Sequence, residues 1–451
     1  MRIIIVGGGV VGFSLAEQLR HENHDIVLIE KETATYEQIR NRTDIQILCG
    51  NGTSPALLET AGIKDADMVV AVTSFDEHNI VICAIAQQYG VERRIARIRS
   101  SEFREGAGIF DLKKLGVTLV TDPEAVLVDA ITQFVETPGA TDAVNFHEGN
   151  VLMRGYRVHR DMPLVGKTLR DIRKETAQHP LLFIAAIRKG EAIIPDGDYT
   201  IEPEDDMFGI FPRPSLEAFL NLFGRSRKEA RNVIIAGTSL TAIQLARQVK
   251  DIVEKVVLID PDYEHGRQAA DILNDVDIIH GDATDAAILQ EVYIRNADFF
   301  IAADKETDSN VMSSLLAKAE GAREVIAVIN DVRHDRLFKS IGIDHVIHPR
   351  LAIANNILEK IHRGQIGRIV RIRNLDIEAL RLTVDPDSPV TGKPLQHIRS
   401  KMQKGTIVGT LLRGDEMIIP DGNTIIEPGD KMIVITHSKN AARVRKLFKA
   451  R

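Results

Sequence analysis

The sequence predicts an α/β protein built from two Rossmann-like, doubly wound parallel sheets, each followed by a small α+β module. First, an apolar strand, a glycine turn and a helix open the chain at 2–12 and return in diverged form at 232–242. Second, a further repeat follows each sheet, because 193–197 and 418–422 both have the sequence Ile-Ile-Pro-Asp-Gly. Self-similarity on this scale indicates a duplicated structural unit.

Each predicted sheet alternates short β-branched runs with longer amphipathic segments, which is typical of parallel strands joined by helices. In the first half we expect strands at 3–6, 25–29, 45–48, 68–72 and 94–98, with a helix at 79–89. In the second half we expect strands at 233–236, 255–259, 277–279, 299–302 and 324–328.

An apolar segment that begins at a proline follows each sheet, at Pro123 and at Pro349. Proline suits the first turn of a helix, so both segments are predicted to be crossover helices. Both are more apolar than an isolated surface helix. They pack either across a subunit or domain boundary or within the molecule, and the sequence leaves both options open.

The modules behind these helices share a Pro-Asp-Gly turn signal, which predicts a hairpin in each. The resulting division of the chain is 1–122 nucleotide-binding domain 1, 123–140 crossover helix, 141–223 module 1, 224–231 linker, 232–348 nucleotide-binding domain 2, 349–367 crossover helix and 368–451 module 2.

Composition restricts the function classes. The chain is 44% hydrophobic and 27% charged, and no apolar run approaches the roughly 18 residues that a membrane helix needs. Only Cys49 and Cys83 could form a disulfide, which favours a reducing, cytoplasmic location. A net charge of −7 argues against nucleic acid as the main partner. Basic stretches at 363–373 and 439–451 are either solvated faces or contacts with acidic lipid or an acidic partner.

The first glycine turn is a dinucleotide-type motif in its proper context, since it follows an apolar strand and opens a helix. Gly7 permits the tight turn, Gly9 lets a pyrophosphate approach the backbone, and Gly12 allows close helix packing. Glu30, at the end of the next strand, would accept hydrogen bonds from the ribose hydroxyls and repel a 2′-phosphate. NAD or NADH, ATP and ADP all satisfy this pattern.

The second copy is weaker. Ser239 replaces the middle glycine and Ala242 the last, so the backbone approach is more crowded, although Asp260 keeps the acid. Occupancy of this second site is left open. Other loops at the carboxyl ends of the strands should line the same crevices.

The predicted nucleotide-binding residues are Gly7, Gly8, Gly9, Val10, Val11, Gly12, Glu30, Asn51, Gly52, Thr53, Thr73, Ser74, Asn79 and Arg97 in the first half. Those in the second half are Gly237, Thr238, Ser239, Leu240, Asp260, Asp282, Thr284 and Asp304. Arg99 and Asn310 are further candidates of the same kind.

Enzyme signatures are missing from the sequence. A tyrosine with a lysine four residues on would indicate a short-chain dehydrogenase, but Tyr36 is followed there by Arg40. The segment at 166–168 resembles the end of a phosphate loop, yet Asp161 stands where its first glycine is required. We therefore predict no catalytic residues and no metal site.

The doubled order of nucleotide fold, crossover helix and module with Pro-Asp-Gly and Ile-Glu-Pro resembles the regulator-of-potassium-conductance family, over essentially the whole chain. The resemblance implies a cytoplasmic regulatory subunit, peripheral on the inner face of the cell membrane, that gates an integral membrane potassium transporter and binds NAD(H) or adenine nucleotides. It also implies rings of eight nucleotide domains, hence a homotetramer. An NAD-dependent oxidoreductase, and a structural tether with vestigial nucleotide sites, remain the alternatives.

Overall fold

The computed structural model describes residues 1–448 except 23, 104–110, 147–148, 332–333, 362–366, 372–376, 399–401, 403–404 and 415. Most of the basic stretch 363–373, and the last residues of the basic tail, lie outside the described part. No helix among the described residues combines the length and apolar character needed to cross a bilayer.

The first nucleotide domain is a six-stranded parallel sheet in the order β3-β2-β1-β4-β5-β6. Its strands are β1 Arg2–Val6, β2 Asp25–Glu30, β3 Gln46–Cys49, β4 Met68–Ala71, β5 Arg93–Arg97 and β6 Leu119–Thr121. Its helices are α1 Val10–His21, α2 Thr33–Arg40, α3 Pro55–Thr60 and α4 Asp76–Gln88. The strand order reverses between β1 and β4, which places the first glycine turn at the topological switch point.

The second nucleotide domain repeats this topology as β14-β13-β12-β15-β16-β17, which confirms the predicted fold class. Its strands are β12 Asn232–Ala236, β13 Lys255–Asp260, β14 Asp277–His280, β15 Phe299–Ala302, β16 Glu324–Val328 and β17 His345–Ile347. Its helices are α8 Leu240–Val249, α9 Tyr263–Ile272, α10 Ala286–Glu291, α11 Thr307–Glu320 and α12 Asp335–Ser340.

Along the described part of the chain, short 3-10 turns occur at Ile63–Asp65, Ser101–Phe103, Arg213–Ser215, Arg227–Glu229 and Ile294–Asn296.

Each module is built on a five-stranded antiparallel sheet, in the orders β10-β9-β11-β8-β7 and β18-β19-β22-β20-β21. Module 1 contains β7 Ala140–Phe146, β8 Val151–Arg157, α6 Leu169–Glu175, β9 Leu182–Arg188, β10 Glu191–Ile193, β11 Asp206–Pro212 and α7 Leu216–Leu222. Module 2 contains β18 Gly367–Arg371, β19 Ile377–Thr383, α14 Leu395–Ile398, β20 Thr406–Arg413, β21 Glu416–Ile418, β22 Lys431–His437 and α15 Ser438–Phe448.

The hairpin of module 1 turns at a different place from the one that Pro-Asp-Gly predicts. Lys189 and Gly190 join β9 to β10, with φ angles of 52° and 82°. Two consecutive positive φ angles match the twist of antiparallel strands in a two-residue loop. Pro-Asp-Gly makes the next turn, between β10 and the isolated bridge of Thr200 with Thr168.

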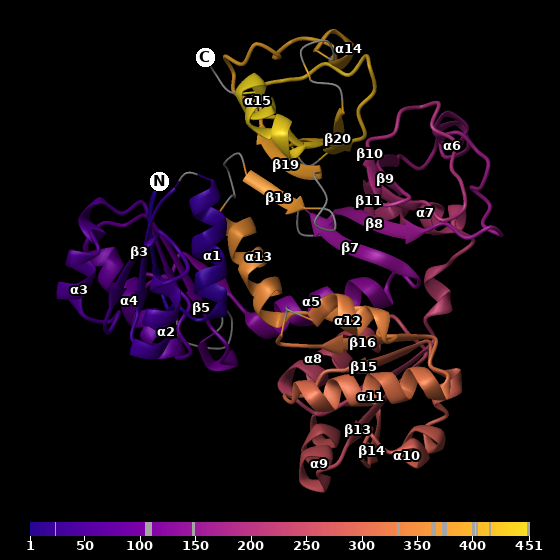
Figure 1. Cartoon of the computed structure of the whole chain (residues 1–451), viewed down its shortest axis with the longest axis horizontal. Coiled ribbons are helices and arrows are strands. Elements are labelled where there is room, and N and C mark those ends of the chain that lie inside the picture. The colour runs from indigo at the N-terminus through magenta and orange to yellow at the C-terminus, as the bar shows by residue number, and fades with distance from the viewer. Residues whose placement is uncertain are drawn as a thin grey trace.

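The two crossover helices are exchanged between the halves. Helix α5 (Pro123–Val135) packs on α8, and its Leu127 and Ile131 lie in the core of the second nucleotide domain. Helix α13 (Pro349–Ile361) packs on α1, and its Ile357 lies in the core of the first (Figure 1). The helices therefore pack across a domain boundary, and this packing is intramolecular, so each of the two expectations is met in part.

Both helices are shorter than the predicted crossover segments, 123–140 and 349–367. Helix α5 ends at Val135, because Thr137 precedes Pro138 and the residue before a proline is disfavoured in helical geometry. Helix α13 ends at Ile361, and β18 has begun by Gly367.

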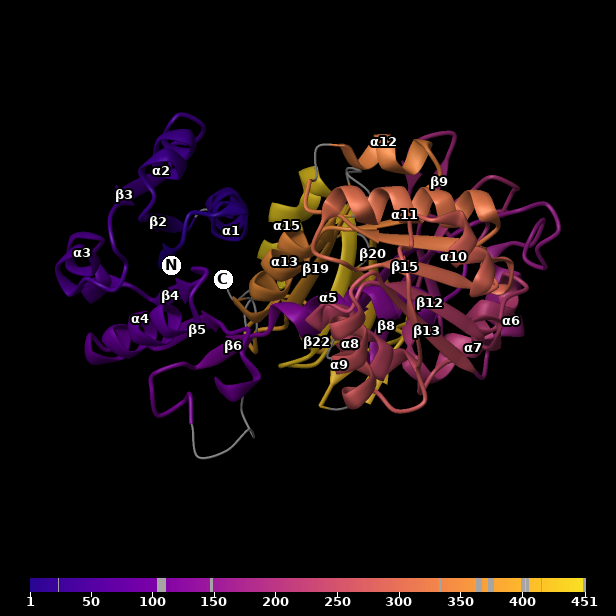
Figure 2. The same cartoon turned by 90° about the horizontal axis from the view of Figure 1, so that it is seen from below.

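The two modules pack face to face. Met153, Ile184 and Ile210 of module 1 share one apolar core with Ile377 and Ile433 of module 2. The two halves of the chain therefore contact each other in two ways, through the exchanged helices and through the paired modules (Figure 2). These contacts hold the carboxyl edges of the two parallel sheets on opposite sides of a single space.

Candidate functional site

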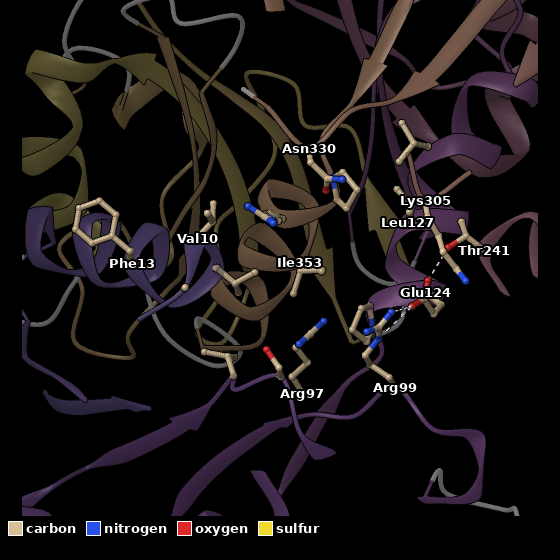
Figure 3. A pocket seen from close by; sticks show the side chains of 18 of the residues that line it. Val10, Phe13, Arg97, Arg99, Glu124, Leu127, Thr241, Lys305, Asn330 and Ile353 are labelled. Atoms are coloured by element: carbon tan, nitrogen blue, oxygen red, sulfur yellow. Dashed lines mark hydrogen bonds and ion pairs between the residues drawn. The ribbon is translucent and has the colours of Figure 1, made fainter. Parts of the chain in front are cut away.

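Both glycine turns open into one cavity of about 650 Å³ between the two halves. Gly8 and Gly9 line it from the first nucleotide domain, and Ser239 and Leu240 from the second. The first turns of α5 and α13 complete the wall. Figure 3 shows Arg97 and Arg99 on one side of this space and Ile353 of α13 across from them. Ligand at either turn would therefore contact both halves of the chain.

The three glycines of the first turn have different tasks. Gly7 has a φ of 109°, and a Cβ on Gly12 would lie 1.9 Å from the Gly7 carbonyl oxygen, so the turn itself requires both. A Cβ on Gly9 would meet nothing within 4 Å. Helix α1 begins directly after Gly9 and has no side-chain cap. Its first amides thus form an uncapped, electropositive helix start beside open space, which suits an anion.

Glu30 stands behind this turn, where β2 ends, and is 8% exposed. Its Oε2 accepts the Gly8 N–H at 2.6 Å and its Oε1 accepts the Glu32 N–H at 2.8 Å. A carboxylate oxygen can accept more than one hydrogen bond, so Glu30 retains capacity for a ribose hydroxyl. In the second copy Asp260 likewise accepts two hydrogen bonds, from the Thr238 hydroxyl at 2.6 Å and from the Asp262 N–H at 2.8 Å.

Charged side chains concentrate at the end of β5. Arg97 donates to the Thr73 carbonyl at 3.1 Å, and its Nε is buried without a hydrogen-bond partner. Burial lowers the pKa of Arg97, and the like charge of Arg99 adds to this effect. Arg99 pairs with Glu124 of α5 at 3.1 Å, and Glu124 accepts the hydroxyl of Thr241, in the first turn of α8, at 2.5 Å (Figure 3).

Some predicted binding residues brace the sheet instead of facing the cavity. Asn79 is fully buried, and its Oδ1 accepts the Thr73 N–H and hydroxyl at 2.9 and 2.8 Å. Its Nδ2 donates to the carbonyls of Arg97 and Thr73. Asn310 joins Asp304 to the end of β16 in the same way. Each of these amides ties two neighbouring strand ends together.

In the loops after β3 and β14, polar side chains also form hydrogen bonds within the loop itself. Asn51 accepts the N–H and hydroxyl of Thr53, and Asp282 does the same for Thr284. A Cβ on Gly52 would lie 2.1 Å from Val6, so this loop packs against the end of β1.

The structure thus divides the predicted residues into two sets. Those that line the cavity are Gly8, Gly9, Val10, Val11, Ser74, Arg97, Ser239, Leu240 and Asp304. Those outside its wall are Gly7, Gly12, Glu30, Asn51, Gly52, Thr53, Thr73, Asn79, Gly237, Thr238, Asp260, Asp282 and Thr284.

The cavity also contains residues that the motif analysis missed, chiefly Glu124, Arg350, Thr241, Lys305 and Asn330. Each of the first two follows the proline that starts a crossover helix. Aligning the two repeats at those prolines pairs a glutamate with an arginine, and that charge reversal was the available signal.

Fold and site together define the class: a tandem pair of Rossmann-like domains with appended modules, which exchange helices around a shared cavity. The TrkA-N domain model matches residues 3–123 and 233–349, and the TrkA-C domain model matches 153–224 and 379–449. The chain therefore belongs to the TrkA family.

Two full-length relatives support this assignment. The Trk system potassium uptake protein TrkA of Halomonas elongata is 31% identical, with 99% of this chain and 98% of the relative covered. The protein of the same name from Haemophilus influenzae is 30% identical with the same coverage.

Solved structures share the fold. The GsuK RCK domain superposes with a TM-score of 0.60 at 19% identity, covering 100% of this chain and 95% of that one. The GsuK channel bound to NAD gives 0.61 at 19% identity, covering 99% and 78%.

Proposed function

We propose that this chain is the cytoplasmic, nucleotide-binding regulatory subunit of a Trk-type potassium uptake system. Family membership over the full length supports the regulatory role, because the relatives are named as Trk system potassium uptake proteins. The observation that carries the mechanism is the single cavity into which both glycine turns open. In this proposal 1–122 and 232–348 are the nucleotide-binding units, and 141–223 and 368–451 are the appended modules.

The nucleotide is NAD or NADH, with ATP or ADP as the alternative. The amides that follow Gly9 and the guanidinium of Arg97 would hold its phosphates, and Glu30 its ribose. The uncapped start of α1 and the partnerless Nε of Arg97 support this assignment. A related fold, the GsuK channel, has been solved bound to NAD.

Bound nucleotide acts here as an effector, through the exchanged helices. Helices α5 and α13 begin at the cavity wall and end in the other half, so a change at the cavity alters the angle between the nucleotide domains. We propose that these helices transmit that change to an integral membrane potassium transporter.

The energy required of each site is small. Moving a two-state ring from 1:99 to 99:1 takes about 5.5 kcal/mol. In the proposed homotetramer this amounts to less than about 1.5 kcal/mol per nucleotide, whether four or eight sites are filled. We place the assembly on the cytoplasmic face of the cell membrane, beneath the transporter.

The experiment compares Gly9→Ala with a matched control, Gly266→Ala. The added Cβ enters open cavity space at Gly9, and at Gly266 it would lie 3.5 Å from Ile278, away from the cavity. Gly9→Ala should keep its oligomeric state in light scattering but lose nucleotide-dependent potassium uptake in reconstituted vesicles. Glu30→Gln should weaken the same response. Unchanged nucleotide dependence in Gly9→Ala would defeat the proposal.

Two further measurements address the alternatives. Steady oxidation of NADH by the isolated chain, with a panel of candidate substrates, would favour the oxidoreductase. An absence of binding heat with both NADH and ATP would favour the structural tether.

A further inference from the structure

The two glycine turns differ in how their helix starts are satisfied. In the first copy, Gly9 precedes α1 and no side chain caps the helix. In the second copy, the Ser239 hydroxyl accepts the N–H of Ala242 at 3.2 Å and donates to the Ala303 carbonyl at 2.7 Å. In the second turn, a side chain of the protein therefore already accepts a hydrogen bond from one of the N–H groups that a phosphate would use.

The exchanged helices also bring opposite charges to the two turns. Glu124 of α5 is 8% exposed and accepts the Thr241 hydroxyl at 2.5 Å, in the first turn of α8. Its other oxygen accepts from Arg99 at 3.1 Å. A carboxylate from the first half thus accepts a hydrogen bond from a side chain in the first turn of α8, the end of a helix at which the dipole favours an anion.

Arg350 is the counterpart of Glu124 at the start of α13, and it lines the same cavity. Helix α13 packs on α1 as α5 packs on α8, so Arg350 has the place relative to α1 in the duplicated architecture that Glu124 has relative to α8. Its charge is close enough to Arg97 to contribute to the lowered pKa of that residue, after burial and Arg99.

The residues at the ends of the corresponding strands β5 and β16 also differ in charge. Arg97 and Arg99, at the end of β5, correspond to Val328 and Asn330 at the end of β16. Asp304 lies close to the second turn, since its Cβ is 3.0 Å from where a Cβ on Gly237 would stand. Arginines therefore gather at the strand end beside the first turn, where the second half has Val328 and Asn330, while Glu30 contacts the first turn itself and Lys305 follows Asp304 in the cavity wall.

We infer that the second glycine turn is occupied by the chain's own carboxylate, Glu124, so that each chain holds one nucleotide, on the first turn. Arg350, from the opposite half, is the specificity-determining contact for the phosphates of that nucleotide. This inference rests on the proposed nucleotide binding and assigns its stoichiometry. Since Arg99 is held by Glu124, the guanidinium groups of Arg97 and Arg350 are the ones that serve the ligand.

Calorimetric titration of the full chain with ADP, and separately with NADH, tests the stoichiometry. We expect one nucleotide per chain, and none for Gly9→Ala. Two nucleotides per chain would overturn the inference while leaving nucleotide regulation intact. Binding that survives in Gly9→Ala would overturn the inference together with the role proposed for Gly9. No binding at all would overturn both, so the two failures are distinguishable.

Two sets of variants test the residues. Arg350→Ala should weaken binding about tenfold, the loss typical of one charge-assisted contact, without changing the number bound. Arg267→Ala, on the exposed helix α9, is the control and should bind as the wild type does. Unchanged affinity in Arg350→Ala would refute the role of Arg350.

Glu124→Gln keeps the volume of the side chain and an acceptor for Thr241 but removes the charge. We expect a second, weaker binding event in this variant. Glu124→Ala, checked for its oligomeric state, should show the same event more strongly. One nucleotide per chain in both variants would show that Glu124 does not fill the second turn.

Discussion

The exchange of crossover helices makes a direct prediction about Ile131. This residue belongs to the first half in chain order, yet it is fully buried in the second nucleotide domain, in the same core as Leu245 and Phe299. Truncating a buried isoleucine to alanine costs about 2–5 kcal/mol, because transfer energy is lost and a cavity remains. Ile131→Ala should therefore destabilise the second domain by about 3 kcal/mol.

Hydrogen exchange followed by mass spectrometry locates this effect along the chain. A loss of about 3 kcal/mol corresponds to roughly a hundredfold increase in the open population. Peptides from β12 and β15 should exchange faster to that extent, and those from β1 and β4 should not change. Ile357→Ala, fully buried in the other core, should give the reverse pattern.

Val81→Ala is the control, since Val81 is 44% exposed on α4 and its truncation should cost less than about 0.5 kcal/mol. Faster exchange confined to β1 and β4 in Ile131→Ala would refute the helix exchange.

Gly12→Ala should lower the melting temperature and abolish nucleotide binding together, because its Cβ would lie 1.9 Å from the Gly7 oxygen; an unaltered melting curve would contradict this. Burial raises the pKa of Cys83 from 9.0 to about 12, so a thiol reagent at pH 8 should label exposed Cys49 and spare Cys83, as measured by peptide mass; equal labelling would argue against that burial. Burial tends to raise the pKa of Asp205, but hydrogen bonds, first among them that from Arg188, hold it below its usual value. The advantage of wild type over Asp205→Asn in free energy of unfolding should thus be present above about pH 4 and shrink as pH falls, and a pH-independent difference would be inconsistent.

Local patterns were sufficient for the fold. Apolar β-branched runs such as Ile3–Ile5 become central strands because strands buried on both faces need continuous hydrophobic sequence. The first glycine turn was equally predictable, since Gly7 and Gly12 are required by the backbone and only Gly9 faces open space.

At the site, some of the predicted residues line the cavity and others do not. Arg97 lines the cavity, as its position predicts, because the carboxyl ends of parallel strands meet at one edge of the sheet. Asn79 lies at the same edge, but its amide is consumed by backbone groups of two neighbouring strands. Residue type and position do not reveal which polar groups the strand ends themselves require.

The sequence by itself determined the duplication, the two parallel sheets and the conformation of the first glycine turn, because these depend on neighbours close along the chain. Only the tertiary structure decided that α5 covers the second sheet and α13 the first. An apolar helix face fits either of two similar sheets, so the choice depends on packing between segments far apart in sequence. That same choice brings Glu124 to Thr241 and places Arg350 in the wall of the shared cavity, and it thereby makes the surroundings of the two turns unequal.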